Sequence, residues 1–468
     1  MRPSRRWAKR MGYREVLALG VPLVTSTLAS SAMMFTDRLF LSRYSLDSIA
    51  ASLPAGIMKF MLTAFFFGTV TYTGVFAAQY MGAGKPRRAA ASLWQGLYLS
   101  LIFGVGLYSL YFLGPWIFSL GGHPEHLLPL ELTYFRVLVL ATPVELMMVT
   151  MSSFLSSVGK ARAVMWVNVA CTALNIPLDY LLIFGVESGG ATVIPPMGVF
   201  GAAVATAASW CVAFLLLSLM VFSGRMERSH GTRSTRSLEP ALMRRILRYG
   251  WPSGMQFLME IFAFTFFAFA AGKLGAEILA ANNIVLSIES MSYIPMLGIG
   301  QAVSIMVGQS VGRGTPHEGR DAAVSGIVLI TAYLSCILFA FVTFSGPIIS
   351  CFMPSGMDPA AAARITALGT VLLKFVVLYS FFDGIYICCF GTIKGAGDVW
   401  FPMWAMAVWG ALLFLGVMAL FLVDAATIYS LWAVLVTYVL LLTFTGYWRF
   451  RSGKWMKLRV IEAGPALD

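Results

Sequence analysis

Twelve long apolar blocks constrain the fold of this chain more than any other feature. Each block can cross the ~30 Å hydrocarbon core of a bilayer, because a helix needs about 20 apolar residues to do so. Membrane β-barrels would show alternating segments of about ten residues instead. The sequence therefore predicts an all-α polytopic membrane protein with twelve transmembrane helices. The blocks cover approximately residues 14–41, 50–80, 92–118, 130–157, 162–186, 198–223, 247–272, 280–311, 322–346, 364–392, 400–423 and 426–448.

Composition excludes a soluble enzyme. Hydrophobic residues make up 59% of the 468 residues and charged residues 12%, whereas soluble globular proteins have about 45–50% apolar and about 25% charged residues. The six cysteines lie in or at the ends of apolar blocks and form no Cys-x-x-Cys pair, so no metal or redox motif is visible. These cysteines are Cys171, Cys211, Cys336, Cys351, Cys388 and Cys389.

The basic residues predict the orientation of the chain in the membrane. By the span count above, 26 of the 33 Lys and Arg residues lie on one side. They occupy the N-terminal arm, the even-numbered loops and the C-terminal tail, which predicts that both termini are cytoplasmic. The net charge of +12 is therefore a topology signal, with attraction to anionic membrane lipid as a by-product, and no nucleic-acid partner is expected. We expect an integral protein of a bacterial or archaeal cytoplasmic membrane.

The chain contains an internal repeat. A shift of 230 residues matches residues 20–84 to the second half without a gap, and a further match appears near a shift of 238. Six spans separate the copies, so both have the same orientation, which is typical of parallel repeats in transporters. The matched pairs include Gly20 with Gly250, Pro22 with Pro252, Gly68 with Gly298, Gln79 with Gln309, Glu145 with Asp383 and Gly159 with Gly397.

The repeat predicts two six-helix bundles related by a pseudo-twofold axis, and it favours transport by alternating access. Duplication that only builds a larger scaffold is the alternative. The predicted parts are a basic cytoplasmic arm (1–13), an N-terminal lobe (14–223), a cytoplasmic linker (224–246), a C-terminal lobe (247–448) and a cytoplasmic tail (449–468).

Ionisable side chains inside the spans are candidate functional residues, because each costs about 2.5 kcal/mol or more to insert. Asp37 lies late in the first span, where the alternative is a helix-end charge paired with Arg38. Asn175 and Asp179 share a face of the fifth span, with Pro177 between them freeing a carbonyl. A polar contact between helices is the alternative there.

The second half carries its own acidic residues. Glu260 lies about ten residues from either end of the seventh span and cannot reach the interface. Tyr379 and Asp383 share a face of the tenth span, where a phenol and a carboxylate can share a proton or ligate a hard cation.

Three further charges, Lys59, Glu145 and Glu289, are candidates for a cavity lining. Glu289 aligns with Lys59 in the repeat, so these two residues could instead form a pair between the lobes.

Buried carboxyl groups of this kind can take up a proton on one side of a membrane and release it on the other. A sodium ion can occupy the same oxygens, so the sequence leaves H⁺ and Na⁺ open as the coupling ion. Either ion would exclude an organic cation that needs the same negative charge, which would couple ion entry to substrate release.

Several short motifs follow one another along the chain. They are Gly20-Val21-Pro22, Thr36-Asp37-Arg38-Leu39-Phe40-Leu41, Ala50-Ala51, Gln79-Tyr80-Met81-Gly82-Ala83-Gly84, Asn175-Ile176-Pro177-Leu178-Asp179 and Gly201-Ala202-Ala203-Val204-Ala205-Thr206, with their second-half copies. In this order they resemble the multidrug and toxic compound extrusion (MATE) family over residues 14–450. The sequence departs from that resemblance at Glu289 and in the long loop 187–197 before Thr206.

The resemblance implies two six-helix bundles that expel small organic cations in exchange for H⁺ or Na⁺. It assigns an N-lobe coupling site to Asp37, Asn175, Asp179 and Thr206, and a C-lobe site to Glu260, Tyr379 and Asp383. We expect a monomer without a cofactor or certain metal site, and no enzyme activity, because no nucleophile with a positioned base is visible. A flippase for lipids or lipid-linked oligosaccharides is the alternative, although it would be expected to have a basic cavity.

Overall fold

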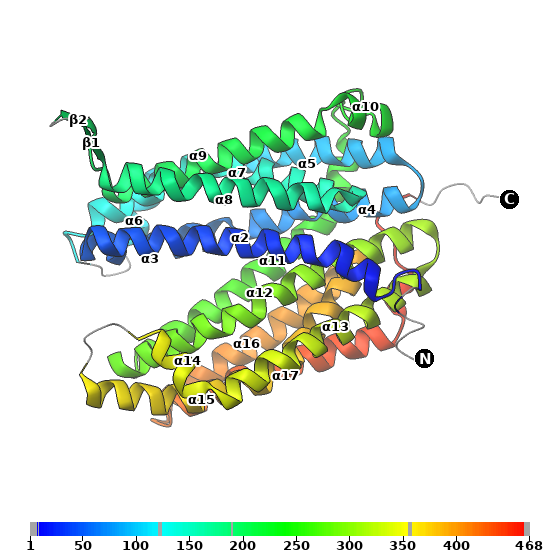
Figure 1. Ribbon diagram of the computed structural model, residues 1–468. Coiled ribbons are helices and arrows are strands. Elements are labelled where there is room, and N and C mark those ends of the chain that lie inside the picture. Colours follow the sequence, from blue (N-terminus) through cyan, green and yellow to red (C-terminus); the bar gives the residue numbers. More distant parts are fainter. Residues whose placement is uncertain (1–6, 8, 120–123, 189–190, 354–357, 463–468) are drawn as a thin grey trace. The chain divides into compact units, whose positions relative to one another are not determined.

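The computed structural model describes residues 7, 9–119, 124–188, 191–353 and 358–462. Long helices dominate these residues (Figure 1). Two of the predicted parts are described only in part. Residues 1–6 and 8 of the basic arm, and residues 463–468 of the tail, lie outside the described residues.

The first half consists of α2 (Tyr13–Tyr44), α3 (Leu46–Thr71), α4 (Thr73–Gly82), α5 (Pro86–Gly106), α6 (Ser109–Ser119), α7 (Leu128–Leu155), the π-helical segment η1 (Ser156–Lys160), α8 (Ala161–Phe184), β1 (Val186–Ser188), β2 (Ala191–Ile194), α9 (Gly198–Val221) and α10 (Gly224–His230). The second half consists of α11 (Pro240–Gly272), α12 (Ala276–Arg313), α13 (Pro316–Thr343), α14 (Ser345–Cys351), α15 (Pro359–Ala396), α16 (Trp400–Leu422), α17 (Ile428–Arg451) and the 3₁₀ turn η2 (Lys454–Lys457).

Local sequence signals explain several helix starts. Proline occupies the first turn of α5, α13 and α15, where its missing N–H leaves no bond unmade. Ser45 caps α3 by accepting a hydrogen bond from the Ser48 N–H at 3.0 Å, and Asp358 caps α15 by accepting from the Ala361 N–H at 3.1 Å. Thr427 and Ser430 form a reciprocal capping box at the start of α17.

Eleven helical stretches among the described residues are long and apolar enough to cross a membrane. One of them, Leu128–Phe184, has 57 residues, and a helix of that length would extend ~85 Å, far more than one bilayer. It contains the predicted fourth and fifth spans, joined through η1, where Gly159 adopts a φ of +84° that a side chain would strain. The predicted all-α polytopic membrane fold is confirmed.

Two details differ from the sequence prediction. The second span is divided into α3 and α4 at Tyr72, and the third into α5 and α6. The loop 187–197 contains part of a short antiparallel hairpin, because β1 pairs with β2. The sequence shows no strong strand pattern in that loop, and three- to four-residue strands are too short to produce one.

The described chain forms two compact units. Unit 2 is Thr25–Gly254, and unit 1 combines Met1–Val24 with Met255–Asp468. The boundaries therefore fall inside α2 and α11, whereas the sequence predicted a boundary in the linker 224–246. The start of each of these two helices packs with the helices of the other half, which no linker composition could reveal.

Each unit has its own apolar core. In unit 1, Phe267, Val303 and Trp432 are fully buried among side chains of α11, α12, α15 and α17. In unit 2, Phe135 and Val139 of α7 pack on Val199 and Ala202 of α9. Small residues on α9 allow this close approach.

The predicted linker is fixed on α5 rather than free. The indole N–H of Trp94 donates to Thr232 O at 2.6 Å, and the amide of Gln95 donates to Ser237 O at 2.9 Å. The hydroxyl of Tyr98 donates to Arg236 O at 2.5 Å. These bonds place residues 232–237 within unit 2.

Candidate functional site

A polar cluster inside unit 2 joins α2, α8 and α9. The Thr206 hydroxyl on α9 donates a hydrogen bond to Asp37 Oδ2 on α2 at 2.9 Å, and both side chains are buried. The structure thus brings together two residues that lie 169 positions apart in the sequence.

Asn175 on α8 connects the two carboxyl groups of this cluster. In the amide orientation that satisfies both neighbours, its nitrogen donates to Asp37 Oδ1 at 3.2 Å and to Asp179 Oδ2 at 3.0 Å. Asp179 Oδ1 is buried and has no hydrogen-bond partner among the described residues. The cluster therefore contains more acceptor oxygens than protein donors, and a proton or a cation can supply what is missing.

Local sequence explains why these helices meet. Asn175 and Asp179 are one turn apart on α8, so they face the same way. Gly201 on α9 lies so close to α8 that an added Cβ would be 2.5 Å from Leu182 O. Only glycine allows that approach, which holds α9 against α8 five residues before Thr206.

Lys59 and Glu145 form an ion pair inside unit 2. Lys59 Nζ lies against Glu145 Oε2 and also 4.7 Å from the centre of the Trp210 ring. Both charged side chains are largely buried, at 4% and 12% exposure. The partner of Lys59 is therefore Glu145, which corrects the alternative of a pair with Glu289.

A second acidic cluster lies inside unit 1. The Tyr293 hydroxyl on α12 donates to Glu260 Oε1 on α11 at 3.0 Å. Sequence reasoning missed Tyr293, although it lies four residues after Glu289 and thus on the same face of α12. That spacing was a signal that could have found it.

Glu289, Tyr379 and Asp383 also belong to this cluster. The phenol of Tyr379 lies beside Glu289, and Asp383 is close enough to Glu289 and Glu260 for their charges to act on it. All three side chains are buried.

Several buried polar atoms around this cluster have no hydrogen-bond partner among the described residues. They are Tyr379 Oη, Ser380 Oγ and Gln256 Oε1. Such atoms are rare in proteins unless water, an ion or a ligand completes them. These atoms in the interior of unit 1 can therefore form hydrogen bonds to a small polar ligand, a water molecule or an ion.

The ligand atoms available in both clusters are mainly oxygens. No group of three His, Cys, Asp or Glu side chains arranged for a metal ion occurs in the described part of the chain. Carboxylate, amide and hydroxyl oxygens suit a proton or a hard cation such as Na⁺ rather than a transition metal. The donor sets thus fit either ion that the sequence left open.

Comparison with known proteins places the chain among transporters. The MatE family profile matches residues 22–181 and 252–422. A "Probable multidrug resistance protein NorM" of Burkholderia pseudomallei is 30% identical over 396 residues, which cover 84% of this chain and 82% of that protein. The "Multidrug resistance protein NorM" of Burkholderia vietnamiensis is 28% identical over 396 residues, covering 84% of each.

A solved structure described as "Outward-facing conformation of a multidrug resistance MATE family transporter of the MOP superfamily" has the same fold. Its TM-score is 0.82 at 20% identity, over 97% of this chain and 98% of that one. The family match covers most of both halves and includes Asp37, Asn175, Asp179, Glu260 and Asp383. The resemblance seen in the sequence is confirmed: the chain belongs to the multidrug and toxic compound extrusion (MATE) family of membrane transporters.

Proposed function

We propose that this multidrug-efflux type of transporter is a secondary antiporter, which exports small organic cations in exchange for H⁺ or Na⁺ by alternating access. The observation that carries the proposal is the pair of buried acidic clusters, one in each unit. Among the described residues, Asp179 Oδ1 in unit 2 and Gln256 Oε1 beside the cluster in unit 1 have no hydrogen-bond donor. A buried carboxylate without enough donors is costly, so it favours the binding of a cation.

Exchange follows from competition for the same negative charge. In unit 2 the oxygens are those of Asp37, Asp179 and Thr206, and in unit 1 those of Glu260, Glu289 and Asp383. When a proton or Na⁺ occupies a cluster, an organic cation loses its counter-charge there and is released. We propose that no other cofactor is needed and that a monomer carries out the cycle.

The acidic character of both clusters supports an organic cation over an anionic lipid headgroup. Lys59, which the sequence analysis named as a candidate cavity residue, is buried in unit 2 and forms an ion pair with Glu145. Its positive charge is therefore neutralised. The orientation with both termini in the cytoplasm belongs to the proposal as well, and the basic loops support it.

Transport by purified protein in liposomes tests the proposal. A fluorescent organic cation is loaded, and a proton gradient and a Na⁺ gradient are imposed separately. We expect one gradient to drive dye movement, and Asp37→Asn or Glu260→Gln to abolish that drive. If neither gradient moves the dye, antiport of organic cations is wrong, and transport of a fluorescent lipid should be measured in the same liposomes.

A further inference from the structure

The starts of α2 and α11 pack on equivalent surfaces of the two units. In unit 1, a Cβ added to Gly20 of α2 would lie 3.7 Å from Ala302 Cβ and from Ile299 Cγ1 of α12. In unit 2, a Cβ added to Gly250 of α11 would lie 3.1 Å from Thr69 Cγ2 of α3. Gly20 and Gly250 are repeat equivalents, as are Thr69 and Ile299. The two packing surfaces are thus copies of one another.

Two similar helix starts therefore have two similar places to pack. Each occupies the place supplied by the other half of the chain, since residues up to Val24 belong to unit 1 and residues up to Gly254 belong to unit 2. In the exchanged arrangement, α2 would start on α3 and α11 on α12. Apolar contact is non-directional and discriminates poorly between two copies of one surface.

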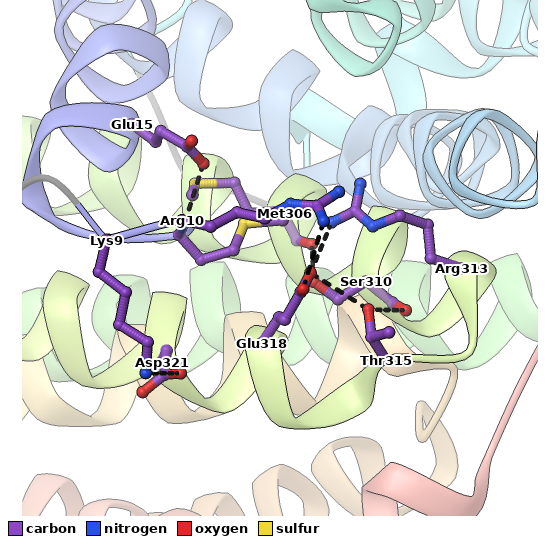
Figure 2. Close-up of polar contacts among 10 residues, drawn as sticks. Lys9, Arg10, Glu15, Met306, Ser310, Arg313, Thr315, Glu318 and Asp321 are labelled. Carbon is purple, nitrogen blue, oxygen red and sulfur yellow. Dashed lines mark hydrogen bonds and ion pairs between the residues drawn. The ribbon is translucent and has the colours of Figure 1, made fainter.

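Charge distinguishes the place in unit 1. Lys9 and Arg10 precede α2, and they face Glu318 and Asp321 in the first turns of α13 (Figure 2). Lys9 Nζ lies 2.7 Å from Asp321 Oδ2, and an Arg10 guanidinium nitrogen lies 3.4 Å from Glu318 Oε1. Between them and the helix, Met11 is buried with a φ of 59°, and its carbonyl accepts a hydrogen bond from Ser325 Oγ.

The place in unit 2 has the opposite polarity. Glu239, just before α11, pairs with Arg88 in the first turn of α5 at 2.7 Å. Glu239 lies 230 residues after Lys9, and Glu318 lies 230 residues after Arg88, so the same shift relates them just outside the matched range 20–84. In unit 2 the acidic residue precedes α11 and the basic residue lies on α5. In unit 1 the basic residues precede α2 and the acidic residues lie on α13.

Steric fit also distinguishes the two packing places, at a position four residues after Gly20 and Gly250. On α12, a Cβ added to Gly298 would lie 2.6 Å from Val24 N, so this glycine admits the backbone of α2. The repeat equivalent of Val24 is Gly254. A Cβ on Gly254 would collide with Phe65 O and Thr69 Oγ1 of α3, so a valine fits on α12 and not on α3.

We propose that these reversed ion pairs, together with the Val24–Gly298 contact, are a recognition code that directs the starts of α2 and α11 to their correct places. In the exchanged arrangement, Lys9 and Arg10 would face Arg88, and Glu239 would face Glu318. Like charges so placed repel. Correct placement matters for the site, because α2 carries Asp37 and α11 carries Glu260, and the start of each helix sets the depth of its acid.

Disulfide trapping tests this code in a chain whose six native cysteines are replaced. The pair Gly20→Cys and Ala302→Cys reports the observed arrangement, because its Cβ separation of 3.7 Å suits a disulfide. The pair Gly20→Cys and Thr69→Cys reports the exchanged one. Both pairs are made in a Val24→Gly background, which removes the steric part of the code.

One set of charges is then reversed by Lys9→Glu, Arg10→Glu, Glu318→Arg and Asp321→Lys. The ion pairs of residues 9 and 10 with α13 can still form, but both places now have the same polarity. Arg313, which pairs with Glu318 at 3.3 Å, loses that pair in this variant and in the control below alike. We expect the ratio of the 20–69 to the 20–302 disulfide to rise at least about threefold, because like charges no longer oppose the exchanged arrangement and surface charge pairs are weak. Adding Arg88→Glu and Glu239→Arg restores opposite polarity and should return the ratio to its starting value.

The second variant keeps the altered N-terminal charges, so it separates the code from an effect on membrane insertion. Equal disulfide ratios in the two variants would overturn the proposal. So would failure of the second variant to recover the 20–302 disulfide.

Discussion

The hydroxyl of Thr206 on α9 donates a hydrogen bond to Asp37 on α2 at 2.9 Å. The bond joins the first and sixth predicted spans inside unit 2, and the amide of Asn175 contacts the other oxygen of the same carboxylate. Asp37 thus has two protein donors when it is ionised. In the proposed mechanism, each donor competes with the coupling ion for this carboxylate.

Thr206→Val should therefore lower the concentration of the coupling ion that gives half-maximal transport. A hydrogen bond to a charged group contributes about 1.5–3 kcal/mol, so the shift should be about tenfold or more. Asp37→Asn should abolish ion-driven transport altogether. Initial transport rates in proteoliposomes, measured over a range of ion concentrations, check both expectations.

Thr206→Ser is the matched control, because it keeps the hydroxyl and loses only a methyl group. Its ion dependence should stay close to that of the unchanged chain. A tenfold shift in Thr206→Ser as well would show that packing, and not the hydrogen bond to Asp37, sets the ion dependence.

The same reasoning applies to Glu260 in unit 1, which accepts a hydrogen bond from Tyr293 at 3.0 Å. Glu260→Gln should abolish ion-driven transport, whereas Tyr293→Phe should preserve it and lower the half-maximal ion concentration several-fold. Tyr333→Phe is the control, because that hydroxyl donates to the Met291 carbonyl and not to a carboxylate. Identical ion dependence in both tyrosine variants would contradict a coupling role for the Tyr293–Glu260 bond.

The buried pair of Lys59 and Glu145 makes a prediction about stability. Lys59→Met leaves Glu145 without its cation and should lower the free energy of unfolding by about 3 kcal/mol. The double variant Lys59→Met and Glu145→Leu should recover most of that loss, because no unpaired charge remains. Unfolding by SDS in mixed micelles measures both changes. If the double variant were as unstable as the single one, the loss would be due to packing against Trp210 instead.

The linker should respond to acid through His230. Burial, followed by the charge of Lys160, lowers the pKa of this histidine below its usual value, and its Nε2 is buried without a hydrogen-bond partner among the described residues. Below a pH of about 6.5, the unfolded segment therefore binds more protons than the folded segment. The free energy of unfolding of the segment is at its full value above that pH, and it falls as the pH is lowered through about 6.5.

Hydrogen exchange of the amides of residues 224–239, corrected for intrinsic rates, should therefore become faster below pH 6.5. His230→Phe, which keeps a ring beside Phe154 and removes the titrating group, should abolish this pH dependence. Persistent acid sensitivity in that variant would assign the effect to another group, such as Glu227, whose pKa is lowered chiefly by the Arg233 backbone N–H.

Much of the fold and part of the site could be predicted from the order of residues. Apolar runs, basic loops and the 230-residue repeat predicted the polytopic helical fold, because helix length and charge placement in a membrane depend on local sequence. The one-turn spacing of Asn175 and Asp179 predicted a shared face for the same reason, since it depends only on the geometry of one helix.

Contacts between helices required the tertiary structure. The pairing of Lys59 with Glu145 and of Glu260 with Tyr293 depends on how far each helix is rotated and displaced along its axis, and these pairs lie 86 and 33 residues apart. The unit boundaries inside α2 and α11 could not be predicted either, because the repeat offers each helix start two similar packing surfaces. The sequence alone determined that the helices form, how many apolar blocks there are and where acids enter them. Only packing between the helices decided which acids meet, because close contact selects one rotation and one depth out of many that the apolar pattern allows.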